Sequence, residues 1–213
     1  MCVVSIKVDM AQRWRYAAGM RALLSIAAVL LVSGVGLATP EPWKLDAGHS
    51  RVGFKVSHLV VSEVSGQFRE FEKSEVQLDE QDLTKSSARI ELRANSIDTG
   101  DSKRDEHLRG PDFFDAKKYP LISFASKSIT RGADGAYRVL GDLTIRDVKK
   151  PLTLDAKVSE AVKSPKGSTV RAVKLSGAIK RSDYGIKWNK TLDTGGAVVG
   201  DEVKLEFQLE LVK

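Results

Sequence analysis

The chain of 213 residues contains a single cysteine, Cys2, which lies ahead of a hydrophobic N-terminal segment. A disulfide needs two cysteines, and the usual structural zinc sites need at least as many, so neither feature can stabilise this fold. A domain of this length buries enough surface to fold without such cross-links. The stability of the protein must therefore come from its hydrophobic core.

The sequence also lacks the short motifs that mark common catalytic and cofactor sites. It contains no glycine-rich phosphate loop, no G-x-S-x-G, no H-E-x-x-H and no C-x-x-C. Its three histidines, His49, His58 and His107, are not spaced as metal ligands on one helix or strand. Adjacent carboxylates such as Asp105 and Glu106 point apart and cannot share acid–base work. The sequence therefore predicts no catalytic residue, no metal and no cofactor.

Charge of one sign is not concentrated on any segment of the main domain. The formal net charge is +6, and residues 1–38 contribute a surplus of three basic side chains. Beyond that segment, basic and acidic residues alternate, without the basic face and interleaved aromatics typical of nucleic-acid binding. We therefore expect no nucleic acid among the partners.

The N-terminal segment has the pattern of a signal peptide. Arg13, Arg15 and Arg21 precede an uncharged run over residues 22–38 that ends in small residues. This run is shorter than the roughly 20 residues that span a bilayer comfortably, although an uncleaved anchor is the alternative. We expect cleavage after Ala38, which leaves residues 39–213 as a single domain.

Period-two alternation of apolar and polar residues dominates the rest of the chain. It is clearest in the last run, where five apolar residues alternate with charged or polar ones over nine positions: Val203, Leu205, Phe207, Leu209 and Leu211. Such alternation is typical of strands with one buried and one solvated face. With about eight runs and no helical layer to cover a flat sheet, the pattern predicts an all-β fold, an antiparallel eight-stranded β-barrel. Gly141 and Gly177 within the runs predict bulges or bends.

One segment, near residues 101–117, departs from the β pattern. Asp101 or Ser102 can cap a short helix that ends at Gly110, and Pro111 can open a second helical turn. The segment could cover one end of the barrel, or it could be a packed helical connection.

Nine short motifs in a fixed order resemble the YceI-like family of lipid- and polyisoprenoid-binding proteins, over the chain from Trp43 to Val212. They are W-x-L-D-x-x-H-S from Trp43, F-x-V-x-H from Phe54, S-G-Q-F from Ser65, N-S-I-D-T-G from Asn95, R-D-E-H-L from Arg104, D-F-F-D from Asp112, Y-P-L-I-S-F from Tyr119, G-D-L-T-I-R from Gly141 and V-G-D-E-V from Val199. The resemblance implies a lipocalin-like barrel, export to the periplasm and a polyisoprenoid or other long-chain lipid held in the barrel. Exchange of that lipid would involve transient contact with a membrane or a membrane protein; the oligomeric state is left open, a dimer included.

An eight-stranded barrel can hold either side chains alone or one slender ligand. If it holds a ligand, a charge-assisted contact from Arg104 or His107 could bind a polar head group. The predicted apolar wall consists of Phe54, Phe68, Ile90, Leu108, Phe113, Phe114, Phe124, Tyr184 and Trp188. The alternatives are a stress or interaction protein with a filled core and an enzyme acting on a bound lipid. The enzyme would require a buried titratable side chain facing the interior.

Overall fold

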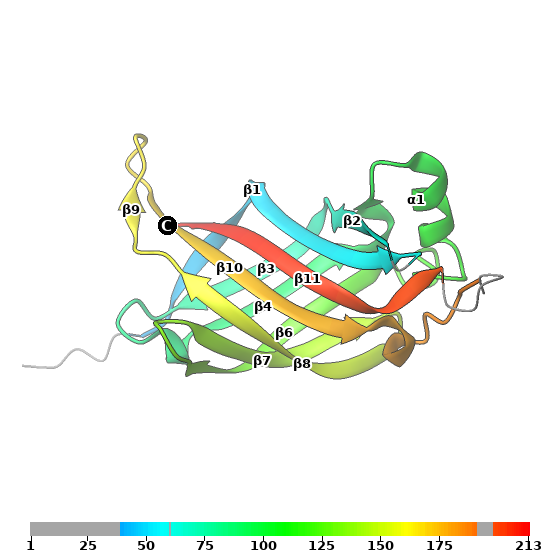
Figure 1. Ribbon diagram of the computed structural model, residues 1–213. Coiled ribbons are helices and arrows are strands. Elements are labelled where there is room, and N and C mark those ends of the chain that lie inside the picture. Colours follow the sequence, from blue (N-terminus) through cyan, green and yellow to red (C-terminus); the bar gives the residue numbers. More distant parts are fainter. Residues whose placement is uncertain (1–38, 60, 191–197) are drawn as a thin grey trace, which may run out of the picture. The chain divides into compact units, whose positions relative to one another are not determined.

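The computed structural model describes residues 39–59, 61–190 and 198–213, which fold into a closed antiparallel β-barrel with one short α-helix near one end (Figure 1). Eight strands form the ring in the order β11-β10-β8-β7-β6-β4-β3-β1, and pairing of β11 with β1 closes it. The predicted eight-stranded barrel is confirmed. The ring strands are β1 (Glu41–His58), β3 (Phe71–Leu78), β4 (Ser87–Arg93), β6 (Leu121–Arg131), β7 (Tyr137–Ile145), β8 (Val148–Val158), β10 (Thr169–Lys180) and β11 (Val199–Val212).

Alternation along the strands sends apolar side chains inward and polar side chains outward. On β8, Leu152, Leu154 and Ala156 are buried, while Thr153 and Asp155 between them are exposed. Because successive side chains in a strand point to opposite faces, this pattern gives each strand one dry and one solvated face. Closing the ring gathers the dry faces into one interior and pairs the edges of β1 and β11 with each other.

The pairing of β1 with β11 contains a bulge near the middle of β1. Asp46 pairs with Glu210, but the next pair is Arg51 with Gln208, so β1 has three extra residues at this point. Bulged residues bend a strand and increase its twist. The bulge thus bends β1 so that its first part pairs with β3 and its second part with β2 (Ser62–Phe68).

Two further short strands lie outside the ring: β5 (Ile97–Asp98) pairs with β2, and β9 (Val162–Lys163) pairs with β10. The helix α1 (Ser102–Arg109) begins after Asp101, whose side chain accepts hydrogen bonds from the backbone N–H groups of Lys103 and Arg104, both at 3.0 Å. This N-cap and the end of the helix at Gly110 were predicted. The predicted second helical turn after Pro111 is wrong, because residues 111–114 form turns only.

The two strand glycines differ from each other. A register shift lies on β6 between Ser126 and Ser128, directly opposite Gly141, so the predicted irregularity is present on the partner strand. Gly177 pairs regularly with Leu205 of β11, and the pairing of β10 with β8 stops one residue earlier, at Ser176. Beyond that point the 3₁₀ turn η4 (Arg181–Tyr184) packs against β8, β10 and β11.

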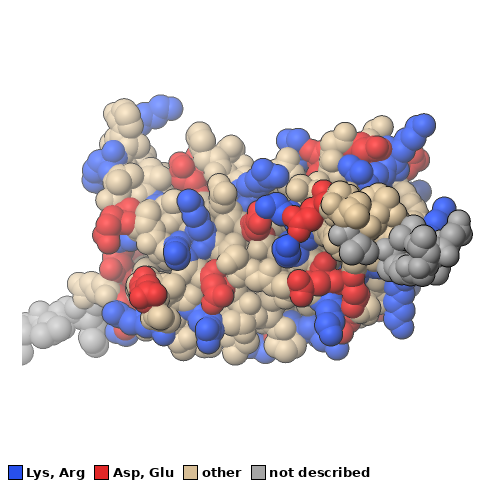
Figure 2. All heavy atoms as spheres, viewed as in Figure 1, with Lys and Arg blue, Asp and Glu red and all other residues tan. Residues whose placement is uncertain are grey.

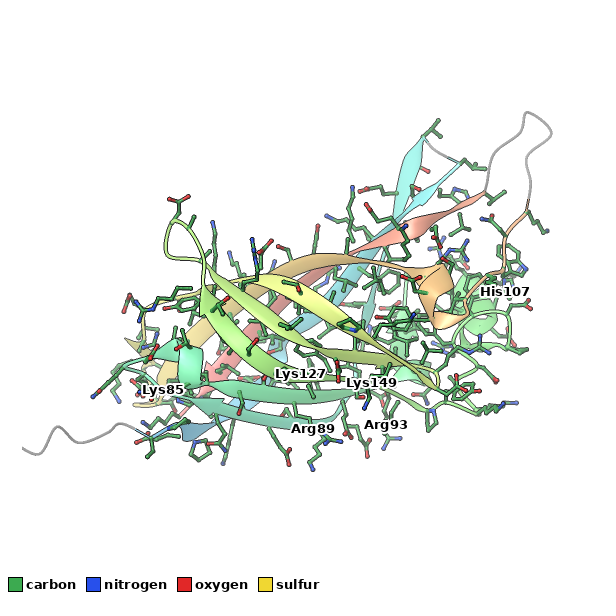
Figure 3. All side chains as sticks on the ribbon, turned by 90° about the horizontal axis from the view of Figure 1, so that it is seen from below. Lys85, Arg89, Arg93, His107, Lys127 and Lys149 are labelled. Atoms are coloured by element: carbon green, nitrogen blue, oxygen red, sulfur yellow. The ribbon has the colours of Figure 1, made fainter. Side chains whose placement is uncertain are left out.

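The outer surface of the barrel carries charges of both signs. Figure 2 shows basic and acidic side chains interspersed over the visible face, and Figure 3 shows Arg89, Arg93, Lys127 and Lys149 directed away from the interior. Several of these side chains form ion pairs, such as Lys127 with Asp142 at 2.7 Å. Exposed pairs of this kind contribute about 0–1 kcal/mol each. The surface therefore adds solubility more than stability.

The predicted signal peptide, residues 1–38, lies outside the described residues. Within the part of the chain that the structure describes, every helix is too short or too polar to cross a bilayer.

Candidate functional site

The inward-facing side chains do not fill the barrel completely. They enclose a cavity of about 260 Å³, close to the lower end of the range of ligand pockets, about 300–1,000 Å³. Its lining includes Val199 at the start of β11 and Leu211 near the end of the same strand. The cavity therefore extends along most of the barrel, and the expected alternative of a solidly filled core does not describe this interior.

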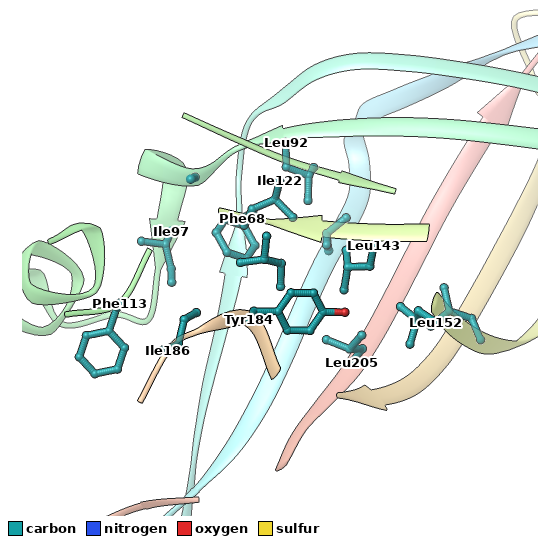
Figure 4. Packing of buried hydrophobic residues seen from close by; sticks show 14 of the residues in the cluster. Phe68, Leu92, Ile97, Phe113, Ile122, Leu143, Leu152, Tyr184, Ile186 and Leu205 are labelled. Carbon is teal, nitrogen blue, oxygen red and sulfur yellow. The ribbon is translucent and has the colours of Figure 1, made fainter. Parts of the chain in front are cut away.

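The lining of the cavity is almost entirely aliphatic and aromatic, and every strand of the ring contributes to it. Part of this wall is shown in Figure 4, where Leu143, Leu152 and Leu205 from three different strands converge. The polar residues among the described lining residues are few, and they expose almost no polar surface to the cavity: Ser86, Ser87, Ser126, Tyr137, Arg181 and Tyr184. Such a cavity favours an apolar guest and offers it few hydrogen bonds.

The structure places eight of the nine predicted wall residues on the cavity. Those that line the cavity are Phe54, Phe68, Ile90, Leu108, Phe113, Phe114, Phe124 and Tyr184. Trp188 packs against the same hydrophobic core without lining the cavity. Whether these residues contact a ligand stays a prediction.

Aromatic rings form a connected group between β1, β2 and the loop after α1. The ring centroids of Phe54 and Phe68 lie 6.0 Å apart, and those of Phe68 and Phe114 lie 5.4 Å apart with an edge-to-face geometry. Aromatic pairs at these separations stabilise each other beyond the burial of their area. They give this part of the wall a fixed shape.

Arg104 and His107, the predicted contacts for a polar head group, do not line the cavity. The Arg104 guanidinium donates hydrogen bonds to Oγ1 of Thr99 at 2.7 Å and to the Thr99 carbonyl at 3.0 Å. The buried carboxylate of Asp105 accepts two more from the same threonine, from its N–H at 2.9 Å and its hydroxyl at 2.6 Å. These bonds fix α1 to the segment that precedes it, and the head-group role of Arg104 stays a prediction.

His107 belongs to a cluster at the end of the barrel that carries α1 (Figure 3). Its Nε2 lies 3.0 Å from Oδ2 of Asp112, and its ring packs edge-to-face on Phe113 and on Trp188, both with centroids 5.0 Å away. The cluster joins α1, the loop after it and the segment that follows η4. Its geometry is that of a packed connection between these elements.

Arg181 is a cavity residue that the sequence analysis missed. It is 8% exposed, and its guanidinium donates to four backbone carbonyls: Gly200 at 2.8 Å, Ile186 at 3.1 Å, Trp188 at 2.7 Å and Val199 at 3.3 Å. Burial lowers its pKa, and the nearby Asp201 carboxylate opposes that shift. Its parity after Leu175, Gly177 and Ile179 was the available signal, since that parity points inward.

Tyr184 is the most buried polar side chain on the cavity wall. It is 2% exposed, and Figure 4 shows its hydroxyl directed toward Leu143 and Leu205, away from Phe113. Burial raises the pKa of the phenol to about 12, with a further contribution from the neighbouring Asp183 charge. The hydroxyl therefore remains a hydrogen-bond donor at every physiological pH.

The β1 bulge places three potential cation ligands together on the outer surface. Ligand atoms of Asp46, His49 and Glu210 lie within 4.8 Å of one another. The Asp46 carboxylate is already occupied, since it accepts from the N–H groups of Gly48 and His49 and lies 2.9 Å from Nδ1 of His49. His49 is exposed and the two carboxylates are half-buried, and the internal hydrogen bonds of the group account for its arrangement as a stabilised bulge.

Comparison with known proteins places this barrel among relatives of similar size. A UPF0312 protein of Staphylococcus aureus (strain N315) is 37% identical over 166 residues, which is 78% of this chain and 94% of that protein. The crystal structure of Campylobacter jejuni YCEI protein matches with a TM-score of 0.62 and 30% identity, over 81% of this chain and 98% of that one.

Two further solved structures share the fold. Burkholderia cenocepacia BcnA matches with a TM-score of 0.69 and 27% identity, over 78% of this chain and 99% of that chain. A polyisoprenoid binding domain from Saccharophagus degradans matches with a TM-score of 0.56, over 79% of this chain and 97% of that domain. Its 17% identity shows similarity of fold alone.

The family model described as the YceI-like domain matches residues 43–211, nearly the whole described barrel. The family predicted from the sequence motifs is therefore confirmed, and this chain belongs to the YceI-like domain family.

Proposed function

We propose that the protein is an exported, periplasmic lipid carrier that holds a long amphiphilic chain, a polyisoprenoid or a related lipid, in the barrel. The observation that carries this proposal is the apolar cavity that extends along the barrel. The Saccharophagus degradans domain, which is described as polyisoprenoid binding, has the same fold and supports this class of ligand. The signal-peptide pattern of residues 1–38 supports export.

Apolar burial alone can supply the affinity. Each CH₂ group moved from water into the cavity contributes about 0.8 kcal/mol. A chain of a dozen carbons then outweighs the several kcal/mol lost on immobilising it. Loading and release would need transient contact with a membrane or a membrane protein, because such a chain has almost no solubility in water.

A lipid-modifying enzyme is the less favoured reading. General acid–base catalysis works best with a group whose pKa lies near the operating pH. Within the described part of the chain, the cavity has two buried titratable side chains, Arg181 and Tyr184, and both remain protonated near neutral pH. Neither offers a proton acceptor to a bound chain.

Extraction tests the proposal directly. The protein is expressed with its leader, purified from the periplasm, extracted with organic solvent and analysed by mass spectrometry. We expect a stoichiometric long-chain lipid. Absence of lipid, together with no uptake of a C20 prenyl alcohol by the purified protein, would contradict the carrier function.

A matched pair of variants locates the binding. Ala156 is buried on the cavity wall, and Ala178 points outward from β10. Ala156→Leu should reduce the amount of bound lipid because its added carbons occupy the cavity, whereas Ala178→Leu should leave it unchanged. Circular dichroism checks that both variants keep the fold; equal lipid content in both folded variants would place the lipid elsewhere.

A further inference from the structure

The cavity wall carries one tyrosine that is almost completely buried, and the described residues give its hydroxyl group no hydrogen-bond partner. This is the phenol of Tyr184, which lines the cavity at the end where η4 enters the barrel. Burying a hydroxyl without a partner costs about 1–3 kcal/mol in proteins, so such groups are rare unless something binds to them. The surrounding wall of leucines provides no acceptor.

The other hydroxyls of the cavity wall differ from Tyr184 in exposure or in partners. Ser126 accepts a hydrogen bond from the Ala88 N–H at 2.9 Å, and Ser86 accepts one from the Asp79 N–H at 3.0 Å. Ser87 is exposed, and Tyr137 at the start of β7 is half-buried. Tyr184 alone among the described lining residues combines an exposed fraction of only 2% with a hydroxyl donor that has no partner among those residues.

The charge around Tyr184 restricts what the donor can bind. Among the described residues, the one cation on the cavity wall is Arg181, three residues earlier, and four of its N–H groups are bound to backbone carbonyls. A phosphate or diphosphate brought to this depth would lose its hydration and find few free donors to replace it. An uncharged oxygen loses much less on burial and needs only one donor.

We propose that Tyr184 donates a hydrogen bond to an uncharged oxygen acceptor on the bound chain, so that the oxygen-bearing end of the lipid lies inside the barrel. This rests on the proposed carrier function and narrows the ligand to a prenyl or similar chain with a hydroxyl, ether or carbonyl oxygen. The proposal also assigns the contact with the polar end of the lipid to a residue of η4, instead of to Arg104 or His107 on α1 as the sequence analysis predicted.

Three C20 probes with the same chain test this assignment: geranylgeraniol, the hydrocarbon that lacks its oxygen, and geranylgeranyl phosphate. Dissociation constants are measured on delipidated protein for the wild type, for Tyr184→Phe and for Tyr119→Phe as the matched control, since Tyr119 does not line the cavity. Tyr184→Phe should weaken binding of the alcohol about three- to tenfold, the range for one hydrogen bond, and leave the hydrocarbon within twofold. Tyr119→Phe should change neither, because the Tyr119 hydroxyl donates to Oδ2 of Asp147, outside the cavity.

Several results would overturn the assignment. One is an equal loss for the alcohol and the hydrocarbon in Tyr184→Phe, which would indicate a packing role; another is no loss for the alcohol. Tighter binding of the phosphate than of the alcohol by the wild type would contradict the uncharged head group. If the wild type binds none of the three probes, the proposed carrier function is contradicted. If the wild type and Tyr184→Phe bind the alcohol equally well, only the proposed role of Tyr184 is contradicted.

Discussion

The ring of Phe124 covers Gly141 on the neighbouring strand and occupies the place where a side chain would be. A Cβ atom added to Gly141 would collide with this ring and would lie 2.5 Å from the carbonyl oxygen of Ala125. Both Phe124 and Gly141 face the interior, and Phe124 lines the cavity. The absence of a side chain at position 141 therefore sets the position of one wall of the cavity.

Replacing Gly141 by alanine should lower the free energy of unfolding by about 1–3 kcal/mol, because the added methyl overpacks the wall against a backbone carbonyl that cannot move away. Urea denaturation followed by circular dichroism measures this. Gly177→Ala is the control: its Cβ would meet Cδ2 of Leu154 at 2.8 Å, the end of a flexible side chain, and would lie 3.2 Å from the Thr153 carbonyl oxygen, a milder backbone contact than the 2.5 Å at Gly141. A loss in Gly177→Ala as large as that in Gly141→Ala would contradict the explanation.

A lysine at position 181 should destabilise the barrel by about 2–4 kcal/mol. Lysine keeps the charge but cannot reach the carbonyls of Trp188 and Gly200 together, so buried acceptors lose their partners. Arg146→Lys is the control, since Arg146 donates a single 3.2 Å hydrogen bond to Gly185 in the same region. Denaturation midpoints of the two variants should differ clearly; similar midpoints would mean that the Arg181 bonds contribute little.

Strand parity made most of the fold and of the cavity wall predictable from the sequence. On β11, Leu205 and Leu211 are buried as the alternation predicts, and the same parity rule places Phe54 and Phe124 on the cavity wall. Closure of the barrel could be predicted because few other arrangements bury the apolar face of so many strands that are polar on their other face. The number of strands and their inward faces are thus consequences of a local pattern.

The features that parity could not reveal depend on contacts between distant segments. Parity places Arg181 on the inward face, but a charged residue at a strand end normally faces solvent, and only the structure shows that the carbonyls of the following loop and of β11 enclose it. The bulge at residues 46–51 and the turn after Pro111 depend on pairing with β11 and on packing around Phe113. Whether an interior has room for a guest depends on differences of a few ångströms, which no sequence pattern encodes.

The side chains of Asp46 and His49, which lie in the β1 bulge, should titrate in a coupled way. The hydrogen bond to Asp46 raises the pKa of His49 above its ordinary value of 6.5, and the same bond lowers the pKa of Asp46 below 3.8. The stabilisation from His49 is complete below pH 6.5 and is lost as the pH rises through the folded pKa. The stabilisation from Asp46 is complete above pH 3.8 and is lost as the pH falls through the folded pKa of Asp46. The hydrogen bond between the two side chains therefore stabilises the fold fully between pH 3.8 and pH 6.5.

NMR titration of the His49 ring checks this coupling. Asp46→Asn should bring the pKa of His49 back toward 6.5, and Glu210→Gln should lower it less, since Glu210 Oε1 lies 3.9 Å from the ring nitrogen. An unchanged pKa in Asp46→Asn would show that the pair does not form in solution.

Tyr184→Phe should make the empty protein more stable, even though it weakens binding of an oxygen-bearing lipid. The phenol hydroxyl gives up its water on folding and gains no partner among the described residues, so removing it should raise the free energy of unfolding by about 1 kcal/mol. In a domain of this size that corresponds to a rise of about 2–4 °C in Tm, which differential scanning calorimetry of delipidated protein can resolve. Tyr137→Phe should shift Tm by less, because that residue is half-buried. A fall in Tm for Tyr184→Phe would mean that the hydroxyl has a partner within the protein. A rise in stability together with a loss of lipid affinity is expected of a polar group that serves ligand binding rather than the stability of the fold.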